Sequence, residues 1–202
     1  MDGDAGPAQL TELGFYTLAG HSATPRDLVT EVADAERLGL GTAFVSERFN
    51  TKDAPTLCGA VAACSDRLGI ATAATNHNTR HPIVTATFSV TMHRMTGGRF
   101  ALGLGRGFDM LFGIMGLPPI TMAQMGDAID LQRRLWAGEL VMGHDGPAGS
   151  YPMLCLDPDF DEHFRVGYRN DGATVYQRRD GVEPPSADLD RPEVDRSADG
   201  AS

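Results

Sequence analysis

Short apolar segments alternate with longer helical patterns along this chain, and that alternation restricts the fold more than any other feature of the sequence. Four segments have the length and apolar content of buried strands: 13–18, 42–46, 70–75 and 99–104. A helical pattern follows each of the first three, and a further one covers 121–136. Strands and helices that alternate in this order form parallel sheets through right-handed crossovers. The sequence therefore predicts an α/β fold with a parallel sheet.

Local signals mark where these helices begin and end. Thr24 is a candidate N-cap with Pro25 in the first helical position, and Pro82 opens a later helix in the same manner. Gly39 stands where the first helical pattern stops. After the last helix, residues 137–160 are rich in glycine and proline, which predicts a hairpin or an extended loop.

The charge balance restricts the partners. The chain has 202 residues and a formal net charge of −10, whereas nucleic acids and anionic membranes attract basic surfaces. The first ten residues lack the features of a signal peptide, and no apolar run has the length of a membrane span. We therefore expect a cytoplasmic protein that binds neither nucleic acid nor membrane. Its three cysteines are expected to be buried, reduced thiols: Cys58, Cys64 and Cys155.

A glycine-rich stretch, GGRFALGLGRGFD at 97–109, suggests a nucleotide-binding loop. The dinucleotide fingerprint G-x-G-x-x-G does not fit, because the spacing of Gly103, Gly105 and Gly107 is G-x-G-x-G. Glycines at these positions allow a flat or phosphorylated ligand to approach the backbone closely. A plain strand-to-helix turn explains the spacing equally well, and from the spacing alone both interpretations stay open.

Four features stand in order along the chain: an aromatic first strand, a second strand ending in SERF (46–49), a polar loop before RHP (80–82), and MTGGRFALGLGRG (95–107). This series resembles the bacterial luciferase-like family of flavin- or deazaflavin (F420)-dependent oxidoreductases, over about residues 11–160. The resemblance implies a (β/α) barrel of the TIM type with its cofactor at the carboxyl ends of the strands. It also implies that the glycine loop follows the fourth barrel strand and leaves room beside the cofactor ring.

The implied function is an oxidoreductase or monooxygenase that uses F420 (first choice) or FMN for hydride transfer with a small organic substrate. The alternative is a non-catalytic luciferase-like fragment that acts as a cofactor-binding or subunit-interaction protein. A small flavodoxin-like domain also fits the βαβ order, but the loop after the first strand lacks a dense phosphate-binding sequence. The substrate is not indicated.

The resemblance also suggests site residues. Glu47, after the second strand, is the first catalytic candidate, with a solvated carboxylate paired with Arg48 as the alternative. Many F420-dependent relatives have histidine in the place of Arg48. His77 is the second catalytic candidate, and His77 with His81 is a poor metal pair because no third ligand lies at a usual distance. The cofactor-binding candidates are Thr75, Asn76, Gly103, Gly105, Gly107 and Asp109. Similar enzymes carry a backbone bulge near Thr75 and Asn76, sometimes with a non-proline cis peptide, which Ala73 and Ala74 would permit.

The predicted organisation has three parts: a flexible stretch at 1–10, a partial barrel domain at 11–164, and a disordered tail at 165–202. The tail is charged, aperiodic and poor in large aliphatic residues. A (β/α)₈ barrel needs at least about 200 fully used residues. We therefore expect only about the amino-terminal half of the barrel, with low activity, and homo-oligomers formed through exposed sheet edges.

Overall fold

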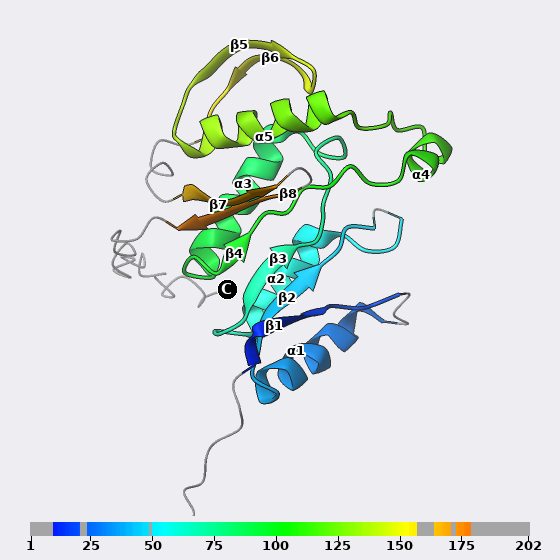
Figure 1. Ribbon diagram of the computed structural model, residues 1–202, viewed down its shortest axis with the longest axis vertical. Coiled ribbons are helices and arrows are strands. Elements are labelled where there is room, and N and C mark those ends of the chain that lie inside the picture. The colour runs from blue at the N-terminus through cyan, green and yellow to red at the C-terminus, as the bar shows by residue number, and fades with distance from the viewer. Residues whose placement is uncertain (1–9, 21–23, 49, 157–163, 171–172, 179–202) are drawn as a thin grey trace, which may run out of the picture.

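A computed structural model describes residues 10–20, 24–48, 50–156, 164–170 and 173–178. Its centre is a four-stranded parallel sheet with the order β1-β2-β3-β4 (Figure 1). The strands are β1 (Leu10–Tyr16), β2 (Leu40–Val45), β3 (Gly69–Thr72) and β4 (Phe100–Ala101). The predicted α/β fold with parallel strands in chain order is confirmed.

Helices connect the strands, and the structure places most of them close to the predicted positions. They are the 3₁₀ turn η1 (Pro25–Asp27), α1 (Leu28–Arg37), α2 (Ala54–Cys64), α3 (Pro82–Met95), α4 (Asp109–Ile114) and α5 (Met122–Trp136). Thr24 caps η1 by accepting a hydrogen bond from the Arg26 amide, as predicted. Thr121 and Gln124 form a capping box at the start of α5. The short helix α4 was not predicted from the sequence.

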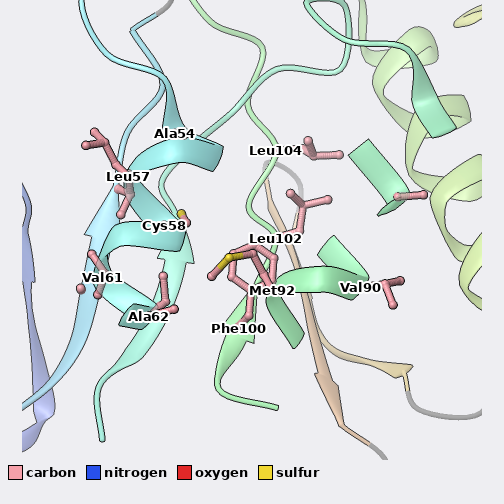
Figure 2. Packing of buried hydrophobic residues seen from close by; sticks show 14 of the residues in the cluster. Ala54, Leu57, Cys58, Val61, Ala62, Val90, Met92, Phe100, Leu102 and Leu104 are labelled. Carbon is pink, nitrogen blue, oxygen red and sulfur yellow. The ribbon is translucent and has the colours of Figure 1, made fainter. Parts of the chain in front are cut away.

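One face of the sheet is covered by helices, and the other is partly open. Ala43, Val45 and Ile70 are buried on the helix-covered face, whereas Phe44, one residue along β2, keeps 36% of its surface exposed. Figure 2 shows part of the covered core, where Met92 of α3 lies with Phe100 and next to Leu102. This alternation is the period-two pattern of a sheet with one packed face.

The cysteines differ in part from the prediction. Cys58 is buried in the core on α2, and burial raises the pKa of its thiol far above the ordinary value. Cys64 and Cys155 are exposed free thiols, so the expectation of burial is wrong for both. Cys64 is the last residue of α2, and the backbone is already extended at Ser65. Its thiol therefore lies at the exposed end of the helix.

Two antiparallel hairpins follow the sheet. The first, β5 (Val141–Gly146) with β6 (Gly149–Leu154), confirms the hairpin alternative for 137–160. The second, β7 (Phe164–Asn170) with β8 (Ala173–Arg178), lies in the segment expected to lack regular structure, and β8 contacts β4. The sequence between these strands is Asp-Gly, the pair that two-residue hairpin turns prefer, and this signal was overlooked. Flexibility was predicted for 1–10, but Leu10 already belongs to β1. Residues 1–9, and residues 179–202 of the segment predicted to be disordered (165–202), lie outside the described residues.

No helix in the part of the chain that the structure describes combines the length and the apolar character needed to cross a membrane.

Candidate active site at the carboxyl edge of the sheet

A pocket of about 540 Å³ opens where the parallel strands end. Residues that follow each strand contribute to it: Tyr16 at the end of β1, Ser46, Glu47, Arg48, Asn50 and Thr51 after β2, Ala73, Ala74 and Asn76 after β3, and Gly107, Phe108, Met110, Leu111 and Phe112 after β4. Parallel strands place their carboxyl ends, and therefore the loops that follow them, at one edge. The polar side chains scattered through the sequence meet there for this reason.

Glu47 is a buried carboxylate in this edge, not a solvated one. Its side chain is 1% exposed, and its two oxygens have three donors. Oε2 accepts from Arg80 Nη1 at 2.7 Å and from Thr75 Oγ1 at 3.0 Å, and Oε1 accepts from the Ala54 amide at 3.3 Å. The alternative interpretation, a solvated carboxylate paired with Arg48, is therefore wrong. A carboxylate with this many donors is held in one position by the ends of two strands and by the first turn of α2.

Arg80 joins these elements. Besides Glu47 it donates from Nη1 to Thr75 Oγ1 at 3.1 Å and from Nη2 to Asp53 Oδ1. Asp53 is in turn the N-cap of α2, and its Oδ2 accepts from the Thr56 amide at 2.9 Å. One guanidinium thus connects the segment after β2, the segment after β3 and the start of α2. We name Glu47, Asp53, Thr75 and Arg80 the carboxyl-edge cluster.

The pKa values in the cluster follow from burial and pairing. Burial lowers the pKa of the Arg80 guanidinium, but the hydrogen bonds and charges of Glu47 and Asp53 outweigh this effect and raise it. Burial raises the pKa of the Asp53 carboxyl, whereas the hydrogen bonds from Thr56 and the charge of Arg80 lower it by more. Arg80 and Asp53 therefore both stay ionised over the pH range in which the protein would work.

The two predicted residues after β3, Thr75 and Asn76, have different surroundings. Asn76 is buried, lines the pocket, and donates from Nδ2 to the Gly105 carbonyl at 2.9 Å. Thr75 is also buried, and its hydroxyl belongs to the carboxyl-edge cluster and does not line the pocket. The peptide bond between Ala73 and Ala74 is cis, and both residues line the pocket. The backbone irregularity expected near Thr75 is thus present just before it.

The three glycines of the loop have different surroundings. Gly103 pairs with Thr72: its amide donates to Thr72 Oγ1 at 2.7 Å, and that hydroxyl donates to the Gly103 carbonyl at 2.9 Å. A Cβ on Gly103 would overlap the Thr72 carbonyl oxygen. Glycine is therefore required here so that the segment after β4 can lie close to the end of β3. A Cβ on Gly105 would lie 3.1 Å from the Ala74 Cβ, beside the pocket wall. Gly103 and Gly105 are not among the residues that line the pocket, whereas Gly107 is.

Replacing Gly103 with alanine is expected to destabilise the fold by about 3 kcal/mol, because backbone atoms of Thr72 cannot move aside without breaking the pairing of the strand ends. Urea unfolding measures the effect. Gly59→Ala on α2 is the matched control, since a Cβ there meets nothing within 4 Å. Equal stability of the two variants would show that the strand ends are not packed as described.

His77 and Asp109 do not line this pocket. His77 lines a separate small cavity with Gln132 of α5 and Tyr151 of β6. Burial lowers the pKa of His77, although the charge of Asp127 acts to raise it. Asp109 is exposed and lies 3.6 Å from Arg106 in an ion pair. In the part of the chain that the structure describes, no group of three or more His, Cys, Asp or Glu could hold a metal ion. Of the predicted site residues, Glu47, Asn76 and Gly107 line the pocket, and Thr75 is bonded to Glu47 beside it. The predicted residues that do not line the pocket and are not part of this cluster are His77, Gly103, Gly105 and Asp109.

Sequence reasoning overlooked Arg80 and the helix α4. A signal for Arg80 was available, because it is a cation in a polar loop that follows a strand and precedes a helix. The α4 segment supplies an apolar wall, with Phe108 and Met110 both 74% exposed and Phe112 buried. Its sequence, DMLFGI, is too short for a helical period to stand out.

The fold and this edge are those of a known family. Residues 10–155 match the family model of luciferase-like monooxygenases, and the chain belongs to this family. Its four parallel strands form about the amino-terminal half of the luciferase-like (β/α) barrel.

Several characterised proteins are similar to the chain. It is 33% identical over 139 residues to an F420-dependent glucose-6-phosphate dehydrogenase of Beutenbergia cavernae, covering 62% of this chain and 41% of that one. It is 30% identical over 188 residues to the enzyme of the same name from Nocardia farcinica, covering 86% and 50%. The chain thus spans half or less of the length of these relatives.

Solved structures show the same fold. The coenzyme F420-dependent tetrahydromethanopterin reductase of Methanopyrus kandleri matches with a TM-score of 0.64 at 20% identity, over 75% of this chain and 47% of that one. The oxygenating constituent of 3,6-diketocamphane monooxygenase from Pseudomonas putida, solved with FMN, matches with a TM-score of 0.59 at 20% identity, over 71% and 44%. At these identities the likeness concerns the fold alone.

Proposed function

We propose that the chain is an oxidoreductase of the luciferase-like family that binds the ring of coenzyme F420, or of FMN as second choice, in the pocket at the carboxyl edge of the sheet. The observation that carries the proposal is the pocket itself, which is built from residues after all four strands and is large enough for a flat tricyclic ring. The names of the relatives, F420-dependent dehydrogenases and reductases beside an FMN-bound monooxygenase, support the order of the two cofactors.

The residues present fit such a ring. Gly107 borders the pocket with bare backbone, and a Cβ there would lie 2.5 Å from Phe112 Cζ and 3.0 Å from Asn76 Nδ2. Ala73 and Ala74 add small side chains on the β3 side. These residues and Asn76 would hold the ring, and a bound deazaflavin or flavin supplies hydride transfer. The chain's own part is to shape the cradle and to exclude water from it with the apolar wall of α4.

We assign Glu47 a positioning role. Both of its oxygens are engaged by donors of the carboxyl-edge cluster, so the carboxylate holds the segment after β2 against the segment after β3. Arg80 supplies the counter-charge to the buried carboxylate at 2.7 Å. The roles first considered for Glu47 and His77, proton transfer to or from a substrate, receive no direct support from this arrangement.

Titration with F420 and with FMN, each alone, tests the proposal. The fluorescence of the cofactor should change on binding, with a dissociation constant in the micromolar range or below for F420 and a weaker one for FMN. Turnover with added reductant or candidate substrates then separates an enzyme from a binding protein. Absence of binding for both cofactors would overturn the proposal.

Glu47→Gln distinguishes positioning from proton transfer. If Glu47 only positions other groups, the variant should lose about tenfold in kcat/KM and keep the pH dependence of the rate, because glutamine keeps an acceptor for Arg80. If Glu47 carries a proton, the variant should lose about 10²-fold or more in kcat/KM and one limb of the pH profile. Steady-state rates between pH 5 and 9 decide between the two, and loss of a limb would contradict the assignment made here.

A further inference from the structure

Arg48 is the cation of the active-site pocket. In the described part of the chain, the charged residues that line this pocket are Glu47 and Arg48. Glu47 is neutralised by Arg80 at 2.7 Å and is 1% exposed, so its charge does not face the pocket. Arg48 is an exposed residue that lines the pocket, and its guanidinium has no hydrogen-bond or ion-pair partner among the described residues.

The backbone of Arg48 is held firmly. Its amide donates to the Lys52 carbonyl at 2.9 Å, and its carbonyl accepts from the amides of Thr51 at 2.6 Å and Lys52 at 2.7 Å. The side chain therefore starts from a fixed point shortly after the end of β2. A guanidinium also presents planar donors that match an oxyanion.

Neighbouring charges leave Arg48 available. Lys52 is close by, but its ammonium donates to the carbonyls of Thr17 at 3.1 Å and Leu18 at 3.0 Å and lies over the Tyr16 ring, 5.4 Å from the ring centroid. Burial, and after it the charge of Arg48, lower the pKa of Lys52, which indicates that the two cations lie within reach of each other's field. Asp109, next to the α4 wall, is already paired with Arg106. No described carboxylate thus competes for the Arg48 guanidinium.

Part of the pocket lining is apolar. Phe108, Met110 and Leu111 line it from α4 and the residue before it, and Tyr16 lines it from β1. Phe108 and Met110 expose most of their surface, and exposed apolar side chains that line a pocket are typical of a ligand-binding surface. The pocket therefore combines one available cation with an apolar wall.

We propose that Arg48 binds an oxyanion, a carboxylate or a phosphate, on a substrate whose remaining part is apolar and packs against the α4 wall. This inference rests on the proposed function, because it concerns the substrate of the same pocket. A guanidinium presents several N–H donors in a fixed plane and no acceptor. The residue is thus suited to binding and orientation, and not to proton transfer.

Binding of a neutral and an anionic probe of the same shape tests the proposal. Isothermal titration calorimetry with 4-phenylbutyrate and with 4-phenylbutyramide should show that wild type binds the acid at least tenfold more tightly than the amide. Arg48→Gln should abolish this preference, and Arg48→Lys should keep part of it. Arg37→Gln is the matched control, because it removes the same charge from α1, where Arg37 pairs with Asp34 on the surface.

Equal binding of acid and amide by wild type, no binding of either, or an unchanged preference in Arg48→Gln would overturn the proposal. Titration of the same variants with F420 and FMN keeps the two proposals separate. Cofactor binding without a preference for the acid would reject only the role of Arg48. A preference for the acid that depends on Arg48, without cofactor binding, would reject the proposed function and leave the anion site standing.

Discussion

Replacing Arg80 with glutamine is expected to lower the free energy of unfolding by about 3 kcal/mol, because it leaves the Glu47 carboxylate buried without its counter-charge. Exposed ion pairs have far smaller effects, since water screens and solvates both partners. Arg80 is different because its side chain is 19% exposed and bridges two carboxylates and the Thr75 hydroxyl. Unfolding in urea, followed by the fluorescence of the buried Trp136, measures the loss.

Two further variants make this result specific. Arg37→Gln breaks an exposed pair on α1 and should cost less than about 0.5 kcal/mol. The double variant Glu47→Gln/Arg80→Gln should recover part of the loss, because the orphaned charge is removed together with its partner. If Arg80→Gln unfolds at the same urea concentration as Arg37→Gln, the carboxyl-edge cluster does not have the stabilising role described here.

Replacing Gly107 with alanine is expected to lower cofactor affinity at least tenfold and to destabilise the fold by about 3 kcal/mol. Two effects combine in this variant. The backbone has a φ of +71°, which costs about 1 to 2 kcal/mol for a residue with a side chain. The new Cβ also meets Phe112 and Asn76, which are both buried. A shifted Asn76 or Phe112 would narrow the cradle that we propose for the ring.

Gly116→Ala separates the two effects. Gly116 has the same φ of +71°, but a Cβ there meets nothing within 4 Å. It should therefore show the backbone cost alone and keep the affinity of wild type. Thermal unfolding and fluorescence titration with F420 are the two measurements. Equal affinity in the two variants would show that Gly107 does not border the ring.

Much of the fold follows from local signals that act over a few residues. Thr24, Thr121 and the prolines at helix starts supply caps or preset backbone angles within one turn, so the sequence alone locates these helices. The alternation of short apolar strands with helices predicts the parallel sheet in the same way. At β4 the regular strand covers only Phe100–Ala101, although the sequence predicts 99–104. The backbone beyond it pairs through the bridge between Thr75 and Leu104 and through Gly103, which a pattern of apolar residues does not distinguish from a continuous strand.

The carboxyl-edge cluster, in contrast, depends on the tertiary structure. Glu47 and Arg80 are 33 positions apart, and nothing near either residue in the sequence names the other as its partner. Only the register of β2 against β3 brings them together.

The loop glycines also depend on the tertiary structure. Their spacing is compatible with a ligand-binding loop and with a plain turn, and in the structure individual glycines of the loop have different surroundings. Gly103 faces the Thr72 backbone 31 positions away, and Gly107 faces the pocket. The sequence by itself determined the four parallel strands, the helices α1, α2, α3 and α5 and the edge at which the polar residues gather, because caps and periodicity are short-range properties. The tertiary structure decided which of those residues touch, because strand register and helix packing set distances that no local pattern encodes.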